Sequence, residues 1–203
     1  EVSKDETPSL SKLTKHCAEF TSLLGRMIAL QEELDWECYR LYGLLEENVC
    51  CADDDIPVLT SGERAFEIVL ARGIADGELQ SRWFERHGSK PITELPTHWP
   101  ESYRKLVERR IELIETNKEI GLIEKPEYKR RWNTESWDDQ QQRALKSWLL
   151  DRLESRHYWP DTQQQEPRLQ SVAELSDKAS GDHEFLQVAA IYRGREDFDV
   201  AAM

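Results

Sequence analysis

The sequence lacks the features that mark a membrane or secreted protein. Its longest apolar runs are a few residues, far below the roughly 20 that span a bilayer. The first four residues carry no apolar signal segment. All four cysteines lie before residue 52 and never form Cys-x-x-Cys, which argues against a secreted disulfide framework. We therefore expect a cytoplasmic protein with reduced thiols and no membrane contact.

Catalytic motifs are also missing. The nine glycines never form Gly-x-Gly, so the chain has no candidate loop for a dinucleotide, S-adenosylmethionine or a nucleotide phosphate. No Asn precedes Pro, which removes the catalytic tetrad of amino-methyltransferases, and neither Gly-x-Ser-x-Gly nor His-Glu-x-x-His occurs. The five histidines include no pair spaced i, i+4. The sequence predicts no catalytic residue, no cofactor-binding residue and no metal ligand.

Two clusters between residues 50 and 55 are candidate sites. Asp53 to Asp55 are adjacent acids, but a calcium loop needs alternating Asp, a Gly and a terminal Glu, so a solvated turn is the better interpretation. Cys50 and Cys51 are adjacent thiols without a nearby base, and we expect them to be inert. Neither cluster predicts chemistry.

The charge is strongly of one sign. Forty acidic side chains against 27 basic ones give a formal net charge of −13, which opposes binding of the whole surface to nucleic acid or to an anionic membrane. Between Arg82 and Trp132, however, twelve bases face nine acids. Four of these bases flank or adjoin Tyr128 and Trp132, a mixture that can neutralise phosphates and support a base or sugar. The candidate DNA-binding residues are Lys125, Lys129, Arg130 and Arg131. The alternative is a solvated helix face whose bases pair with neighbouring glutamates.

Residues 10 to 45 carry the clearest period. Mostly apolar side chains and cysteines recur at the a and d positions of five heptads, which predicts one long helix. Thr7-Pro8 is the predicted start and Gly43 the predicted stop. At about 1.5 Å per residue the helix would extend roughly 50 Å, so part of its heptad seam should meet a later helix or a second chain. An ordinary core helix is the alternative.

Shorter amphipathic segments follow, and no segment longer than four residues alternates as a strand does. We expect helices after the capping box at Thr60 to Glu63, around 80–86, from Glu101 to Gly121, after the Ser136 cap, and near 169–179 and 183–192. The fold class is therefore all-α, a helical bundle with one long N-terminal heptad helix followed by several shorter helices.

Four parts follow from this pattern. We expect residues 1–48 to form the long helix and 49–159 to form a helical core domain. Because the chain begins without an initiator Met, we expect the long helix to link to an upstream domain that is absent from this chain. Residues 160–168 are a polar linker, and 169–203 form a C-terminal helical segment that we expect to be truncated.

One stretch of the long helix resembles a family signature. Glu33–Leu44 resembles the Leu-Asp-x-x-x-Tyr-x-Leu-Tyr-Gly-Leu pattern that follows target recognition in large adenine-specific DNA methyltransferases. These are the PglX proteins of BREX phage-defence systems and related fused restriction-modification enzymes. Residues 62–72, 83–88, 126–132 and 185–195 look like the C-terminal region of the PglX branch in phage-growth-limitation systems. The resemblance covers the chain from about Arg26 to the end.

The resemblance implies a parent enzyme that uses S-adenosylmethionine to methylate adenine in duplex DNA and acts with other phage-defence proteins. The family's methyl-donor loop and its Asn-Pro-Pro-Tyr motif belong to an upstream domain, so no catalytic residue can be assigned here. The implied partners are the upstream methyltransferase and target-recognition domains, other phage-defence proteins, and duplex DNA through the parent protein.

The sequence thus favours a non-catalytic helical module that holds domains together, docks a partner and contacts the DNA backbone. Two rivals belong to other classes. An independent enzyme is disfavoured because no catalytic constellation occurs. An acidic interaction protein that mimics DNA and occupies a nucleic-acid-binding partner would suit the charge of −13.

Overall fold

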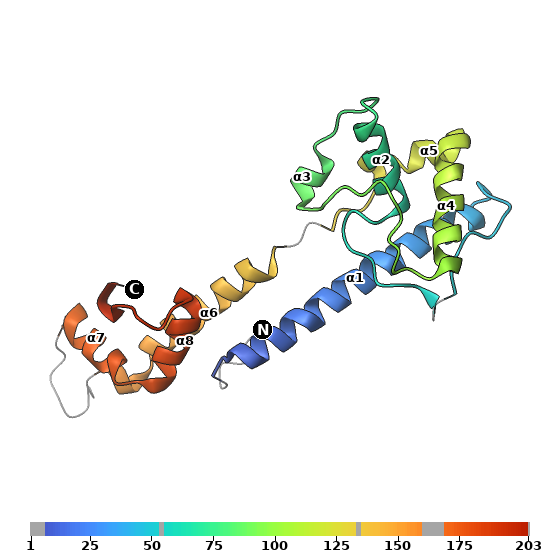
Figure 1. The fold of residues 1–203 in the computed structure, drawn as a ribbon. Coiled ribbons are helices and arrows are strands. Elements are labelled where there is room, and N and C mark those ends of the chain that lie inside the picture. The colour runs from blue at the N-terminus through green and yellow to red at the C-terminus, as the bar shows by residue number, and fades with distance from the viewer. Residues whose placement is uncertain (1–6, 53–54, 133–134, 160–168, 203) are drawn as a thin grey trace. The chain divides into compact units, whose positions relative to one another are not determined.

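A computed structural model of the chain describes residues 7–52, 55–132, 135–159 and 169–202. Within these ranges there is no strand, which confirms the all-α prediction, and the long helix comes first (Figure 1). No helix in the described part of the chain is long and apolar enough to cross a membrane. The α-helices are α1 (Leu10–Leu41), α2 (Ala65–Ala75), α3 (Trp83–His87), α4 (Glu101–Thr116), α5 (Lys118–Ile123), α6 (Trp137–Leu153), α7 (Val172–Ser180) and α8 (His183–Arg193). Short 3-10 turns are η2 (Pro126–Tyr128), η3 (Arg156–Tyr158) and η4 (Val200–Ala202).

The chain divides into two compact units, residues 20–134 and residues 1–19 together with 135–203. This division differs from the predicted one, which placed α6 in a core domain ending at 159. The apolar face of α6, with Leu145 and Leu149, packs on Phe185 and Val188 of α8 instead. That burial joins α6 to the C-terminal helices. The predicted linker at 160–168 lies outside the described residues.

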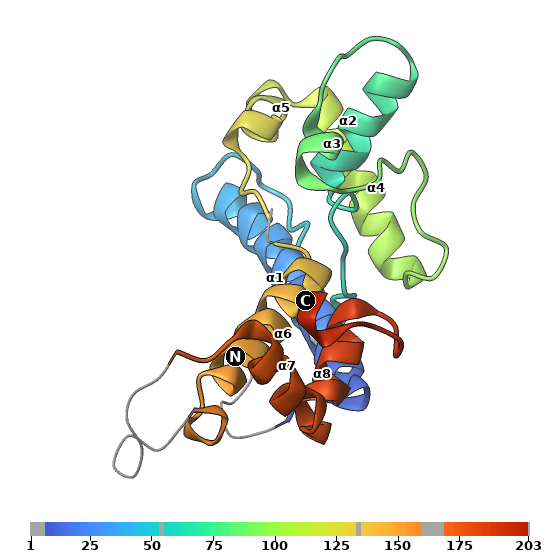
Figure 2. The ribbon, with the colours of Figure 1, turned by 90° about the vertical axis from the view of Figure 1, so that its left-hand side faces the viewer.

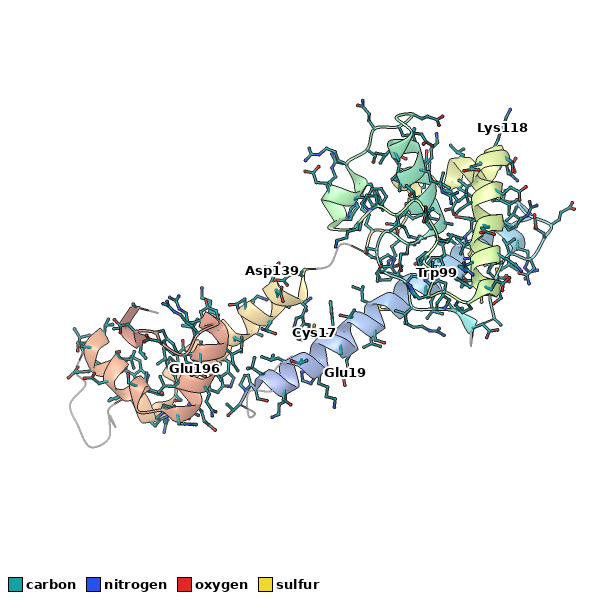
Figure 3. The ribbon with its side chains drawn as sticks, in the orientation of Figure 1. Cys17, Glu19, Trp99, Lys118, Asp139 and Glu196 are labelled. Carbon is teal, nitrogen blue, oxygen red and sulfur yellow. The ribbon has the colours of Figure 1, made fainter. Side chains whose placement is uncertain are left out.

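The core of the 20–134 unit forms between α1, α2 and α4, and α2 packs on α4 (Figure 2). Trp36 of α1 is wholly buried beside Tyr103 and Ile111 of α4. Trp99, in the loop directly before the Pro100 cap of α4, is buried and meets the Tyr103 ring edge-on at 5.2 Å (Figure 3 labels Trp99). Aromatic burial therefore fixes the loop that enters α4.

α1 begins at Leu10, two residues after the predicted Pro8, and Lys12 N reaches Ser9 Oγ at 3.5 Å. Its end is as predicted. Leu44 N donates to Tyr39 O at 2.9 Å and Gly43 N to Arg40 O at 3.0 Å. Gly43 has φ +72, the left-handed conformation that this helix stop requires.

The heptad seam of α1 is not where the prediction placed it. Within the 20–134 unit α1 buries Ile28, Glu32 and Trp36, which recur every four residues. The predicted d positions Met27, Leu34 and Leu41 are 50%, 56% and 68% exposed. No later helix in the described part of this unit covers these three positions, whereas the seam positions Leu24 and Leu45 do pack on the core of this unit. The prediction that part of the seam meets a later helix therefore holds for only some of its residues, and contact with a second chain stays a prediction. The buried face of α1 includes the charged residue Glu32, which an apolar pattern assigns to the surface. The apolar positions Met27, Leu34 and Leu41 therefore lie on the exposed side of the helix.

Two helix boundaries also differ from prediction. α2 begins at Ala65 rather than directly after the predicted box at Thr60, because Glu67 accepts a bond from Arg64 N at 3.2 Å. The predicted helix from Glu101 to Gly121 is two helices. Asn117 Oδ1 accepts from Glu119 N at 2.9 Å and so caps α5.

In the other unit, α6, α7 and α8 enclose a small apolar core around Tyr158 and Phe185 (Figure 2). Three capping side chains start these helices. Ser136 and Ser171 accept from Asp139 N and Glu174 N, and Asp182 accepts from Glu184 N and Phe185 N. The predicted Ser136 cap and both predicted C-terminal helices are confirmed.

Candidate functional site

The interior of the 20–134 unit contains a network of buried charges (the buried ion network). Its members are Glu32, Glu33 and Asp35 of α1, Arg64 before α2, Arg110 of α4, and Glu124 and Lys129 on either side of η2. Four carboxylates therefore share three cations. Buried charges of this kind persist only when they are paired and hydrogen-bonded.

Arg64 joins α2 to α1. Its side chain is 2% exposed, its Nε donates to Glu32 Oε2 at 2.8 Å and its Nη2 to Asp35 Oδ2 at 2.7 Å. Trp36 Nε1 donates to the other Glu32 oxygen at 3.0 Å. Burial alone would raise the pKa of Glu32, but the charge of Arg64 and of two further buried bases lowers it to about 2. Glu32 is thus ionised in the core.

Lys129 occupies the opposite side of the network. Its ammonium lies 2.6 Å from Glu124 Oε1 and 2.7 Å from Asp35 Oδ2. Tyr39 donates to the same Glu124 oxygen at 2.5 Å. Burial nevertheless raises the pKa of Glu124, and the attraction of Lys129 offsets this only in part. Glu124 therefore protonates before Glu32 as the pH falls.

Arg110 completes the network from α4. Its Nη2 donates to Glu33 Oε2 at 2.6 Å and to Val49 O at 2.7 Å. Glu33 Oε2 also accepts from Cys51 N at 2.8 Å. Arg110 thereby fixes the segment after α1 to α4, which is a structural task rather than a chemical one.

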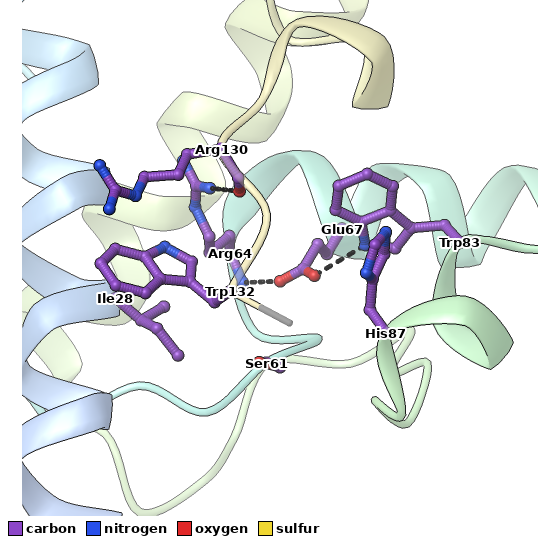
Figure 4. Close-up of a pocket in the computed structure, with 8 residues that line it drawn as sticks. All are labelled: Ile28, Ser61, Arg64, Glu67, Trp83, His87, Arg130 and Trp132. Atoms are coloured by element: carbon purple, nitrogen blue, oxygen red, sulfur yellow. Dashed lines mark hydrogen bonds between the residues drawn. The ribbon is translucent and has the colours of Figure 1, made fainter. Parts of the chain in front are cut away.

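A small hollow borders this network (Figure 4). Its volume is about 10 Å³, room for one water molecule at most. Glu67 projects into it but already accepts from Trp83 Nε1 at 2.9 Å and Gly62 N at 2.8 Å. The hollow cannot take a nucleobase or a methyl donor. Its lining residues are Ile28, Ser61, Arg64, Glu67, Trp83, His87, Arg130 and Trp132.

The structure separates the four predicted DNA-binding bases. Lys125, Arg130 and Arg131 are exposed, whereas Lys129 is buried with its ammonium between Asp35 and Glu124. Lys129 is therefore corrected from a surface base to an internal one. The sequence pattern predicted the wrong environment for Lys129 because the chain turns inward toward α1 after η2. A count of charges along the sequence does not reveal this turn.

The three exposed bases, here called the basic patch, are Lys125, Arg130 and Arg131, which flank η2 in the sequence. The Arg130 guanidinium lies over the Trp132 ring at 4.7 Å, and Arg64 Nη1 donates to Arg130 O at 3.4 Å (Figure 4). Burial lowers the pKa of His87, and the charges of Arg131 and Arg86 lower it further. His87 is therefore predominantly neutral at neutral pH, beside clustered arginines.

A serine, a histidine and an aspartate meet in the other unit without the geometry of a catalytic triad. Ser155 Oγ lies 2.8 Å from His157 Nδ1, and His157 Nε2 lies 3.6 Å from Asp182 Oδ2. The Ser155 hydroxyl already reaches Arg152 O at 2.6 Å, and Asp182 Oδ2 accepts from Arg152 Nε and Tyr158 Oη. The cluster ends α6 and caps α8, and it offers no activated nucleophile.

The thiols and acids weighed from sequence carry no visible site. Burial raises the pKa of Cys50 to about 11, and burial also raises that of Cys51, so both remain thiols at neutral pH. No group of three or more potential metal ligands gathers in the described part of the chain. Asp53 and Asp54 lie outside the described residues.

Sequence reasoning missed the buried ion network, and it took Lys129, one of its members, for a DNA-binding base. One signal could have found it. Glu32 and Glu33 fall midway between Ile28 and Trp36, inside what becomes the buried stripe, and acids at such positions require buried partners.

The sequence of the chain is similar to part of a known protein. The chain is 48% identical over 200 residues, or 97% of its length, to an adenine-specific methyltransferase, PglX, of Streptomyces coelicolor. It spans 16% of that protein and corresponds to a C-terminal part of it. No solved structure matches the chain. The profile of the family described as domain of unknown function DUF7008 matches residues 27–203, and the chain belongs to that family.

Proposed function

We propose that this chain is the non-catalytic helical C-terminal module of an adenine-specific DNA methyltransferase of a phage-defence system. Its tasks would be to hold domains together, to dock partner surfaces and to contact the DNA backbone. The observation that carries the proposal is the 48% identity over 97% of the chain to part of a PglX methyltransferase. S-adenosylmethionine would bind elsewhere in the parent protein, since this chain has neither Gly-x-Gly nor Asn-Pro.

DNA contact is assigned to the basic patch. Lys125, Arg130 and Arg131 are exposed, and no described carboxylate forms an ion pair with them. Stacking on Trp132 leaves the donor edges of the Arg130 guanidinium available for phosphate oxygens. Contacts to phosphate orient a protein on the duplex and carry no sequence information. The patch would therefore support binding without choosing the target.

The net charge sets a condition on this role. A chain of charge −13 is repelled from DNA at long range, while screening at physiological salt acts beyond about 8 Å. A patch of three bases can therefore act once the parent enzyme holds it near the duplex. We expect the isolated chain to bind duplex DNA at about 10⁻⁴ M or more weakly.

The test measures the affinity of the full-length methyltransferase for duplex DNA across a salt series. Replacing Lys125, Arg130 and Arg131 by Gln should weaken binding equally for all sequences and reduce the salt slope by up to about 3. The matched control replaces Lys118, Lys146 and Arg195, three exposed bases dispersed over the chain, by Gln (Figure 3 labels Lys118).

Equal slopes for the wild type and the patch variant would reject DNA contact by this patch, and docking would then account for the module. Equal losses in the patch and control variants would show a general charge effect. Incorporation of methyl groups from labelled S-adenosylmethionine by the full-length protein, and none by residues 1–203, tests the catalytic division.

A further inference from the structure

α1 carries a second apolar face that nothing in its own unit covers. Leucine and methionine side chains, each at least 42% exposed, line one side of the helix from Leu23 to its end at Leu41. This exposed stripe consists of Leu23, Met27, Leu30, Leu34 and Leu41. A contiguous apolar surface of this kind in a soluble domain marks an interaction site.

The spacing of the exposed stripe specifies the shape of what it binds. Its members follow one another at steps of 4, 3, 4 and 7 residues, and at about 100° per residue they fall within one narrow arc of the helix. That is the 3–4 repeat of a coiled-coil seam, which receives the side chains of another helix. An extended strand or a flat surface would not match it.

The two faces of α1 are chemically distinct. Ile28, Glu32 and Trp36 lie roughly opposite the exposed stripe and serve the core and the buried ion network of the 20–134 unit. The exposed stripe takes no part in that core. Since the first face already secures α1, the second is available for a separate contact.

The net charge of the chain and the length of its relative indicate what covers the exposed stripe. A second copy would bring together two chains of charge −13, which opposes self-association. The chain accounts for 16% of the PglX relative, so most of that polypeptide lies elsewhere in the same molecule. A covalently connected helix meets the stripe at an effective concentration of the order of mM, without the cost of bringing two molecules together.

We propose that the exposed stripe packs against an amphipathic helix from the part of the methyltransferase outside these 203 residues. This contact rests on the proposed function. It supplies the surface through which the module would hold domains together. α1 is then a two-sided helix, with one face in its own unit and the other in the body of the enzyme. The partner helix is expected to present leucine-like side chains at 3–4 spacing.

The experiment places the photo-crosslinking residue benzoylphenylalanine at Leu34 of the full-length methyltransferase. The matched control position is Ser22, which is exposed on the same helix away from the stripe. We expect illumination to join Leu34 to a peptide from outside this chain, at monomeric mass and independently of protein concentration. A product of doubled mass that increases with concentration would assign the stripe to a second copy. A yield no higher than at Ser22 would reject the contact.

A second pair of measurements covers the risk of misfolding. The double substitution Leu30→Asp and Leu34→Asp should leave the melting temperature of residues 1–203 unchanged, because both side chains already face water. In the full-length enzyme the same change should let limited proteolysis release the module. Unfolding of the 203-residue chain, or unchanged proteolysis of the full enzyme, would overturn the proposal. Crosslinking needs no methylation, so loss of the proposed function and loss of this contact are separable.

Discussion

The two units of this protein place their charges in opposite ways. In residues 20–134 the cations Arg64, Arg110 and Lys129 are at most 2% exposed and pair with acids from α1 and the segment before η2. In the other unit the cation of the main pair, Arg152, is 31% exposed at the rim of an apolar core, although its partner Asp182 is only 10% exposed. Buried pairs leave a stranded charge when one member is removed, whereas rim pairs can turn to water. The first unit should therefore be brittle to charge changes and the second tolerant.

The sharpest test removes Arg64. Arg64→Met leaves Glu32 and Asp35 without their main cation, and loss of one partner from a buried pair costs about 3–5 kcal/mol of unfolding free energy. Denaturant unfolding measures the change. Arg109→Met is the matched control, because Arg109 pairs with Glu47 and Glu112 on the surface, and we expect little change. Equal losses of unfolding free energy for the two substitutions would contradict the expected difference between buried and exposed ion pairs.

The tolerant unit should instead be sensitive to its apolar core. Leu145 is fully buried against Tyr158, Phe185 and Val188, so Leu145→Ala should cost about 2–5 kcal/mol. Because the two units have separate cores, we expect this unit to unfold earlier while the 20–134 unit unfolds as before. Tryptophan fluorescence together with hydrogen exchange resolves the two units. A single shifted transition for both would show that they unfold as one.

Asp182 tests the rim charges through pH. Burial by itself raises the pKa of Asp182, but hydrogen bonds from Arg152 and Tyr158 hold it below its ordinary range. A lowered pKa in the folded state means that stability is present at neutral pH and is lost as the pH falls below about 4. Asp182→Ala also removes the α8 cap, at a cost of about 0.5–2 kcal/mol. The difference from wild type should therefore shrink on acidification, and a constant difference would contradict this assignment.

The smallest effect is expected on the outer face of α1. Leu34→Ala in the 203-residue chain should change the unfolding free energy by less than about 0.5 kcal/mol, because Leu34 is already exposed. Ile28→Ala on the inner face should cost about 2–5 kcal/mol. Chemical denaturation of the two variants compares the faces directly. A large loss for Leu34→Ala would show that the stripe is covered within the chain.

The parts predicted well are those with local signals. Ser136 is followed by a helical apolar pattern and does cap α6, and Gly43 does end α1. These features depend on a few neighbouring residues, whose backbone preferences are visible in sequence. The all-α class followed because helical periods dominate the chain.

The parts missed depend on contacts between distant residues. Arg64 and Glu32 are 32 positions apart, and Lys129 lies 90 positions from Tyr39. The heptad prediction considered only apolar residues and therefore treated Glu32 as a surface residue. It placed the heptad leucines on the buried face of α1 instead. Only the arrangement of α2 and η2 around α1 supplies the counterions that allow acids into the core.

Ion pairs and a hydrogen bond in the interior of the unit hold the backbone at Lys129 and Arg130. Lys129 is anchored between two carboxylates, and Arg64 donates to the carbonyl of Arg130. The backbone that presents Arg130 is therefore preorganised. In the proposed contact with phosphate, the entropy lost at Arg130 would be confined to side-chain rotamers, at about 0.5–1.5 kcal/mol for each side chain immobilised. The proposed contact with DNA would thus gain from the folding of the core, which has already ordered the backbone at Arg130.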